Sequence, residues 1–379
     1  MTRTTQTQTQ TQTQRAGAAA PPQPATALLI GGAGRGKTTC IRDALRAIAE
    51  GSIIREALRS VATADVPSIV VLDQGGELHD TTATALERTH DVRRLAVLAI
   101  DADGDGNGYG WNPLATCHDH GAAWLLADTW VRNTTDVRAR AGTATWRSTD
   151  RVEAALIAAA ALRLTSEAAA RGTAATLPAL AALVAHTPPA APLGASGAAA
   201  LQARFAVLDD PRVRALVARD DYRPDHLTDP SRRPLAVFVT WPRADAALLR
   251  PLLALLVGQT LTAHRNTSAL LDDRRARPVL VCLDDLASLG IVPGLAHALA
   301  VGAHHGIATI AALADVRHLH ALYGPEADAV LAAFTDTIVL DDAHGTAGAI
   351  PAGTARRSAG RRTSTPADRR PPSTGLVLQ

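Results

Sequence analysis

The sequence predicts an α/β fold in which a mainly parallel sheet is covered by helices on both faces and is interrupted by an all-helical insertion. Short apolar runs of the β type recur in the outer parts of the chain, and most are continuous rather than alternating, as is typical of strands covered on both faces. Between about residues 119 and 217 the chain is instead rich in alanine, has helical spacing and contains no strand candidate.

The individual elements follow from these patterns. The predicted strands cover residues 27–30, 68–72, 95–100, 235–240, 279–283, 307–312 and 337–340. Helical patterns at residues 38–49 and 248–264 alternate with them, as a doubly wound domain requires. The predicted organisation is a disordered tail (1–25), the first part of the core (26–115), the inserted all-α domain (116–230), the second part of the core (231–345) and an Arg/Pro/Ser-rich disordered tail (346–379).

Charge and cysteine content limit the function classes. The 38 basic and 36 acidic residues give a formal charge of +2, which is too balanced to mark a nucleic-acid binder by charge alone. The three cysteines are far apart and odd in number, so a reducing, cytoplasmic location is expected rather than a disulfide framework. Two long windows without charge, 172–203 and 291–314, are interrupted by proline, glycine or histidine, and we predict no transmembrane helix.

The strongest motif is GGAGRGKT at residues 31–38, which fits the pattern G-x-x-x-x-G-K-[ST] between a predicted strand and a predicted helix. Glycines let successive backbone N–H groups surround a phosphate, and the helix N-terminus adds a partial positive charge. Lys37, the single lysine of the chain, is expected to bind the β- and γ-phosphates of ATP, and Thr38 to bind Mg²⁺. A glycine-rich turn with a chance lysine is the alternative. The predicted nucleotide-binding residues are Gly31, Gly32, Ala33, Gly34, Arg35, Gly36, Lys37, Thr38 and Thr39.

A nucleotide site of this kind also needs an acidic strand end. Three apolar runs end in aspartate, at Asp73, at Asp101 and at the pair Asp284 and Asp285. Only the pair supplies one acid for Mg²⁺ (Asp284) and a second to orient the attacking water (Asp285), although an ordinary acidic turn is the alternative. The calcium-like run 101–112 lacks the final glutamate, and the cluster 117–120 lacks a second ligand pair, so neither predicts a metal site.

Taken together, these segments resemble the type IV secretion coupling proteins, the TraG/TraD class of conjugative DNA-transfer ATPases, which belong with the FtsK and HerA type motors. The resemblance covers about residues 26–340. It is carried by VVLDQGGEL (70–78), GYGWNPLA (108–115), the Trp-containing helix at 145–162, and the run from RPVLVCLDDLASLGIVPGLAHAL (277–299) to HHGIATIAALADVRHLHALYG (304–324).

The resemblance implies a RecA-like P-loop core with an inserted all-α domain, working with ATP and Mg²⁺ as a ring that moves single-stranded DNA and its attached relaxase. It implies a homo-oligomer, such as a hexamer, or an assembly with a related motor. Family members are usually anchored by N-terminal membrane helices, whereas a Thr/Gln repeat precedes the first predicted strand here. We therefore expect a cytoplasmic protein that is at most peripheral at the inner face of the plasma membrane.

Several positions depart from the family pattern. Asp285 replaces the usual glutamate, Ala314 replaces a glutamine thought to sense the γ-phosphate, and Gln74 and Gly75 replace Pro and Lys. These departures keep open a second hypothesis, a nucleotide-binding scaffold that hydrolyses little ATP and recruits a relaxase or a full-length motor. A small-metabolite kinase is a third reading, disfavoured because no lid with clustered arginines is recognisable. Candidate DNA contacts are Arg138, Arg140 and Arg147, and candidate trans-acting arginines are Arg274, Arg275 and Arg317.

Overall fold

A computed structural model describes residues 26–50, 66–96, 109–134, 148–186, 194–263 and 276–340, together with the backbone of a short strand at 355–358. Its strands form one sheet in the order β3-β4-β2-β5-β6-β1-β7-β8, and every pairing is parallel. The strands are β1 (Thr26–Ile30), β2 (Ser68–Gln74), β3 (Asp91–Ala96), β4 (Leu235–Trp241), β5 (Val279–Leu283), β6 (Ile307–Leu313), β7 (Asp336–Val339) and β8 (Ala355–Ser358). The predicted α/β class with a parallel sheet is confirmed.

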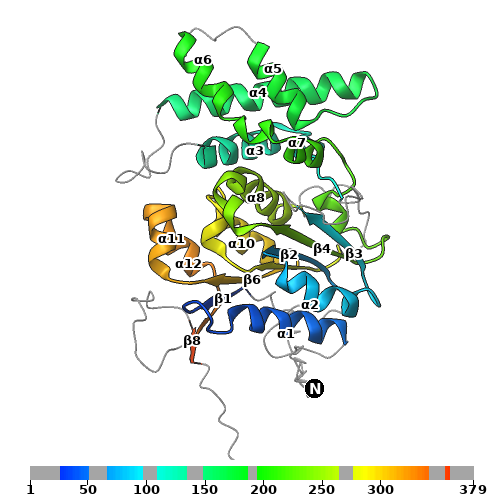
Figure 1. Cartoon of the computed structure of the whole chain (residues 1–379), viewed down its shortest axis with the longest axis vertical. Helices are drawn as coiled ribbons and strands as arrows, with labels where there is room; N and C mark the ends of the chain where they lie inside the picture. The colour runs from blue at the N-terminus through cyan, green and yellow to red at the C-terminus, as the bar shows by residue number, and fades with distance from the viewer. Residues whose placement is uncertain are drawn as a thin grey trace, which may run out of the picture.

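The sheet is covered on both faces, because alternate residues of its central strands pack into two different apolar clusters. Leu28 and Val70 contact one cluster, whereas Leu29 and Val71 contact the other. The second cluster is completed by α1 (Lys37–Ala49) and α2 (Glu77–Leu86), which lie below the sheet in Figure 1. This double cover explains the continuous apolar runs in the sequence.

The opposite face carries the remaining helices of the core and a separate helical layer (Figure 1). On this side the core helices are α8 (Ala246–Leu261), α10 (Leu295–His304), α11 (Val316–Tyr323) and α12 (Ala327–Ala332). The helical layer consists of α3 (His120–Thr134), α4 (Ser148–Ala170), α5 (Leu177–His186), α6 (Gly194–Ala203) and α7 (Pro211–Val217). It lies between β3 and β4 in sequence, as an inserted all-α unit should. Short 3₁₀ turns are η1 (Pro113–Thr116), η3 (Ala206–Asp209), η4 (Pro224–Leu227), η5 (Arg243–Asp245), η6 (Leu286–Leu289) and η7 (Gly324–Glu326).

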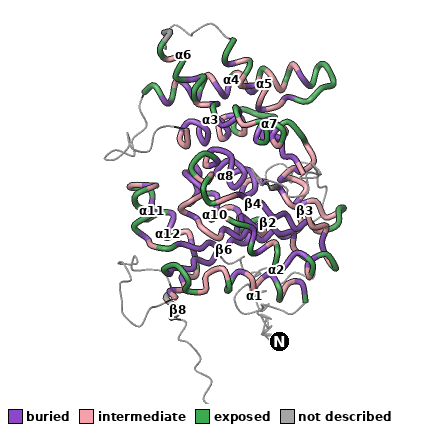
Figure 2. The backbone as a smooth tube through the Cα atoms, in the orientation of Figure 1, coloured by how far each residue is buried: buried purple, intermediate pink, exposed green. Residues whose placement is uncertain are grey.

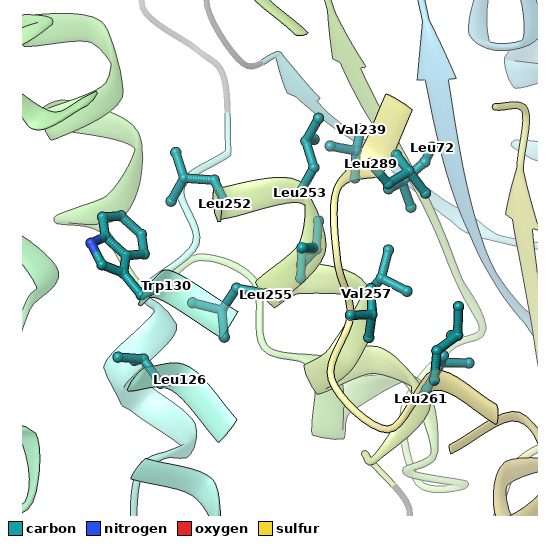
Figure 3. Packing of buried hydrophobic residues seen from close by; sticks show 14 of the residues in the cluster. Leu72, Leu126, Trp130, Val239, Leu252, Leu253, Leu255, Val257, Leu261 and Leu289 are labelled. Atoms are coloured by element: carbon teal, nitrogen blue, oxygen red, sulfur yellow. The ribbon is translucent and has the colours of Figure 1, made fainter. Parts of the chain in front are cut away.

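Helix α8 joins the two parts of the fold. Figure 3 shows Leu252 and Leu255 pointing toward Trp130 and Leu126 of α3, and Leu253 lying toward Val239 of β4. All residues of α8 from Pro251 to Leu261 are buried, which Figure 2 shows as a purple coil. In the described part of the chain, only the stretch Arg243–Leu261 is long and apolar enough to cross a membrane, and 67% of its apolar window is buried inside the protein.

One predicted strand is displaced. We predicted residues 95–100, whereas β3 covers Asp91–Ala96. It is an edge strand of the sheet, where charged side chains such as Arg93 and Arg94 are tolerated because one side of the strand is unpaired. The apolar-run criterion therefore missed its first four residues. Residues 97–100, the calcium-like loop up to residue 108 and both predicted tails apart from β8 lie outside the described residues.

Candidate functional site

The loop between β1 and α1 has a shape that requires glycine. Gly34 and Gly36 have φ angles of 72° and 84°, which side chains with a Cβ rarely adopt. Gly31 lies so close to the end of β7 that a Cβ atom there would be 3.1 Å from the carbonyl oxygen of Leu340. Glycine at positions 31, 34 and 36 therefore allows the chain to turn tightly from the strand into the helix.

The amino end of α1 offers a binding place for an anion. Its N-cap residue is Gly36, no side chain caps the helix, and its first turn contains no acidic residue. The first N–H groups of a helix lack partners within the helix, and they carry its partial positive charge. Lys37 Nζ donates hydrogen bonds to the carbonyl oxygens of Gly31 and Gly32, at 2.6 and 2.8 Å. The ammonium group is thus held over the loop, and this arrangement fits a polyphosphate.

The sheet brings a distant aspartate to the same place. Strand β6 lies between β1 and β5, so two strand spacings of about 4.8 Å separate β1 from β5. Helix α1 follows β1 and begins beside the end of β5. Thr38 lies in its first turn, and its Oγ1 donates a hydrogen bond of 2.9 Å to Asp284 Oδ1. These two residues are 246 positions apart in sequence. A hydroxyl beside a carboxylate is a donor set that suits Mg²⁺ bound also by phosphate and water.

Both acids of the predicted pair have raised pKa values. Burial is the main cause for Asp284; the Thr38 hydrogen bond lowers its pKa, and nearby Asp73 and Asp285 raise it further. Burial also raises the pKa of Asp285, against backbone hydrogen bonds and the charges of Lys37 and His318, which lower it. The charged form of each acid is therefore destabilised here, and a cation would stabilise it.

Asp285 forms a hydrogen bond that stabilises the turn after β5. It is the N-cap of η6, and its Oδ1 accepts a 3.2 Å hydrogen bond from the backbone N–H of Ala287. The turn that follows is anchored by residues that sequence analysis missed. Asn133 of α3 donates to the carbonyl oxygen of Ile291 and accepts from its N–H, at 2.8 and 2.7 Å, and Tyr323 Oη accepts from the N–H of Val292 at 3.0 Å. In the sequence, Gly290 directly precedes this anchored segment, and its φ of 89° marks the turn.

Asp73 at the end of β2 is fully buried, although the sequence analysis favoured the pair Asp284 and Asp285 over it. Its Oδ2 accepts a 2.8 Å hydrogen bond from the N–H of His79, whereas its Oδ1 has no hydrogen-bond partner among the described residues. In the described ranges no three His, Cys, Asp or Glu side chains group closely enough to hold a metal by themselves. A metal here would take further ligands from a nucleotide and water, as Mg²⁺ does.

The position after β6 that was compared with a nucleotide-sensing glutamine is occupied by Ala314. Ala314 is exposed and has no side-chain hydrogen-bonding group. Next to it, Asp315 caps α11 and accepts a 2.8 Å hydrogen bond from Arg317 Nε, which holds the pKa of Asp315 at about 2. Arg317 is exposed but is paired within its own chain. The other candidate arginines (Arg138, Arg140, Arg147, Arg274 and Arg275) and Asp101 lie outside the described residues.

Comparisons with known proteins bear on the family and the fold of the chain. A family model described as the type IV secretion-system coupling protein DNA-binding domain matches residues 21–350. The plasmid coupling protein TrwB in complex with the non-hydrolysable ATP analogue ADPNP is 22% identical, with a TM-score of 0.57, over 83% of this chain and 70% of TrwB. TrwB in complex with ADP and Mg²⁺ is 21% identical, with a TM-score of 0.56, over 82% and 69% of the two chains.

A more distant structure has the same fold. VirB4 of Thermoanaerobacter pseudethanolicus is 13% identical, with a TM-score of 0.50, over 83% of this chain and 76% of VirB4. No curated protein sequence matches the chain significantly.

Proposed function

Because the chain belongs to the family of type IV secretion-system coupling protein DNA-binding domains, we propose that it is a DNA-translocating coupling ATPase that binds ATP with Mg²⁺. The observation that carries the proposal is the 2.9 Å hydrogen bond between Thr38 and Asp284, which joins the phosphate-binding loop to the acidic strand end. The related TrwB structures contain ADPNP, or ADP with Mg²⁺, and we propose ligands of the same class for this chain.

Each residue has a defined role in this proposal. The backbone of residues 31–39 surrounds the phosphates, and Lys37 contacts the β- and γ-phosphates. Thr38 and Asp284 would hold Mg²⁺, and the ion would supply positive charge beside the phosphate oxygens. Asp285 orients the attacking water. The carboxyl ends of β1, β5 and β6 meet at this edge of the sheet, which is where ligands bind in open α/β folds.

The proposed partner is single-stranded DNA, free or joined to a relaxase. The proposed working state is a homo-oligomer, such as a hexamer, or an assembly with a related motor, located in the cytoplasm or peripherally at the inner face of the plasma membrane. Molecular mass in solution with and without ADPNP tests the assembly, since a nucleotide-dependent ring predicts a mass close to six chains only in the presence of nucleotide.

A catalytically weak scaffold is the second candidate, and two observations favour it. Ala314 cannot sense a γ-phosphate through its side chain, and one oxygen of Asp285 is already used to cap η6. Such a protein would bind ATP tightly and hydrolyse little of it. Its role would be to assemble with an active motor or to recruit a relaxase.

The test is the rate of ATP hydrolysis by the full chain, with and without single-stranded DNA. We expect stimulation by DNA and a loss of about 10²–10³-fold in kcat for Lys37→Ala, because a positive contact to the phosphates is removed. The matched control is Asp43→Asn on the exposed side of α1, which should leave the rate unchanged. No DNA stimulation, together with an equally inert Asp285→Glu variant and tight ATP binding, would favour the scaffold instead.

A further inference from the structure

We propose that Asp73 is a second acidic contact for the hydrated Mg²⁺ ion that accompanies the nucleotide. This inference rests on the proposed function and deepens it, because it adds a residue from a third strand to the metal site formed by Thr38 and Asp284. Mg²⁺ sites in nucleotide-binding proteins commonly use one or two carboxylates together with phosphates and water. The position, burial and bonding of Asp73 all fit the second carboxylate.

Asp73 and Asp284 lie side by side at the edge of the sheet. The last paired residues of β2 and β5 are Leu72 and Leu283, so Asp73 and Asp284 are the next positions of two parallel strands about 4.8 Å apart. The N–H of Asp284 donates to the carbonyl oxygen of Leu72 at 3.2 Å, which continues the pairing to this position.

The two side chains also share a face. Side chains alternate along a strand, so Asp73 points to the same face as Val71, and Asp284 to the same face as Cys282. Val71 and Cys282 both belong to the cluster covered by α1 and α2. Thr38 reaches Asp284 from α1 on that same side. The hydroxyl and both carboxylates therefore converge beside the phosphate-binding loop.

The bonding of Asp73 is incomplete without a ligand. The residue is 0% exposed, its Oδ2 accepts a hydrogen bond from the N–H of His79, and its Oδ1 has no hydrogen-bond partner in the part of the chain that the structure describes. A buried carboxylate oxygen without a partner is unfavourable, and a bound ion is one of the few features that account for such an atom in a native protein. Within the described residues, no salt bridge joins Asp73 or Asp284 to a basic side chain.

The charges around the pair point the same way. Asp73 raises the pKa of Asp284, as do Asp285 and Glu77, and burial raises the pKa of Asp73 itself. Burial is the main cause that raises the pKa of Asp73, and the backbone N–H and imidazole of His79 lower it. Carboxylates held together against their own repulsion form a site in which a divalent cation is strongly favoured.

A structural alternative gives the opposite prediction for one measurement. If Asp73 only orders the start of α2 through the N–H of His79, replacing its charge should leave Mg²⁺ binding intact. The variant Asp73→Asn keeps the size and an acceptor oxygen for that N–H, but removes the charge. The Asp43→Asn variant, on the exposed side of α1, is the matched control.

The experiment measures the affinity for a fluorescent ATP analogue in EDTA and in Mg²⁺, and the melting temperature in EDTA without nucleotide. For Asp73→Asn we expect unchanged affinity in EDTA, a loss of about 10–100-fold in apparent Mg²⁺ affinity of the nucleotide-bound protein, and an unchanged or higher melting temperature. The control should match the wild type in all three measurements. A full Mg²⁺ response in Asp73→Asn overturns the inference while leaving the proposed function intact.

Two further outcomes are decisive. If wild-type protein binds no nucleotide in either condition, the proposed function fails and this inference fails with it. If Asp73→Asn does not fold, Asp73→Ser serves as a second variant, because its hydroxyl still accepts the His79 N–H without a charge. Loss of folding in both variants overturns the inference, since the carboxylate would then be required by the fold itself.

Discussion

At the scale of single residues, Lys37 shows why one position uses an ammonium group where the chain otherwise uses arginine. Its Nζ lies 2.6 and 2.8 Å from two carbonyl oxygens of its own loop. A slim, freely rotating ammonium fits such a small concave loop, whereas the planar guanidinium of arginine demands two parallel hydrogen bonds in one plane. The choice of lysine is thus set by the curvature of the glycine-rich turn.

A pH prediction follows from the raised pKa of Asp284. A carboxyl group has an ordinary pKa of about 3.9 in the unfolded chain, and burial raises the pKa of Asp284 above its usual range in the folded one. The folded state therefore binds the proton more tightly. The stability that Asp284 contributes to the folded protein is therefore fully present below about pH 4. It is lost as the pH rises through the higher pKa that Asp284 has in the folded state.

The measurement compares the free energy of unfolding of wild type and Asp284→Asn in EDTA, from about pH 4 to pH 8. Wild type should lose stability relative to the variant as the pH rises, because only wild type acquires a buried charge at position 284. The difference between wild type and Asp43→Asn should show no such slope. If the free energy of unfolding of the wild type instead rises relative to that of Asp284→Asn as the pH increases, Asp284 does not lie in the buried environment described above.

At the scale of elements, the turn after β5 is held from two sides. Asn133 of α3 binds both backbone groups of Ile291, and Tyr323 of α11 binds the N–H of Val292. Asp285 starts this turn as the cap of η6. The helical layer and the segment that follows β5 are therefore joined through hydrogen bonds to the same turn.

Gly290 is the sensitive position of this connection. Its φ of 89° lies in a region almost restricted to glycine, and a Cβ there would come within 2.3 Å of Asn133 Oδ1. We expect Gly290→Ala to reduce the free energy of unfolding by at least about 2 kcal/mol, measured by chemical denaturation. Gly172→Ala is the matched control, since it also has positive φ but meets nothing within 4 Å.

The double variant with Asn133→Ala separates the two causes. It should recover the part of the loss that comes from the close contact, but not the part that comes from the backbone angle. Simple additivity of the two single variants would show that the contact with Asn133 contributes nothing.

The parts of the fold that were predictable are those in which local sequence and tertiary environment agree. Strands such as β2 and β5 are buried on both faces, so a run of apolar residues was sufficient to place them. The glycine-rich loop was predictable because its conformation demands particular residues. The strand β3 was misplaced because it lies at the edge of the sheet and one of its sides is unpaired. Charged residues such as Arg93 and Arg94 are tolerated there, so the strand is not a continuous apolar run.

The site was predictable only as separate pieces. Thr38 and Asp284 each carried a local signal, but their 2.9 Å contact depends on the strand order, which no local pattern encodes. Sequence analysis missed the burial of Asp73 and the hydrogen bonds between Asn133 and Ile291 for the same reason. Both depend on neighbours that are distant in sequence. The local sequence pattern of an aspartate after an apolar run is the same whether its side chain faces solvent or a second carboxylate.

At the scale of the whole molecule, one continuous apolar cluster extends from Leu28 of the sheet through α8 to Val184 of the helical layer. The layer is further fixed by Arg204. Its guanidinium donates to Asp150 and to the carbonyl oxygen of Val131, each at 3.0 Å, and also pairs with Glu153. These three charged side chains are at most 10% exposed. We therefore expect the layer and the sheet to unfold together.

Arg204→Met tests this expectation. It leaves two buried carboxylates without their cation, and we expect a loss of about 3–5 kcal/mol in the free energy of unfolding. Loss of helical circular dichroism and loss of nucleotide binding should shift together to lower temperature. Arg171→Met removes an exposed pairing between the residue that follows α4 and Glu167 of α4, and should cost at most about 1 kcal/mol. Helix loss well below the temperature at which nucleotide binding fails would show that the layer unfolds independently.

The strand order also sets when this protein can acquire its shape during synthesis. Strand β1 pairs with β6, with Thr26 opposite Thr309, and with β7, with Ala27 opposite Asp336. A ribosome that adds about 5–20 residues per second needs on the order of 15–60 s to supply these partners. Throughout that interval β1 is an apolar strand with two open edges. We therefore expect a nascent chain of this topology to need protection from aggregation until β6 and β7 have been synthesised, and nucleotide cannot complete its site before β5 is in place.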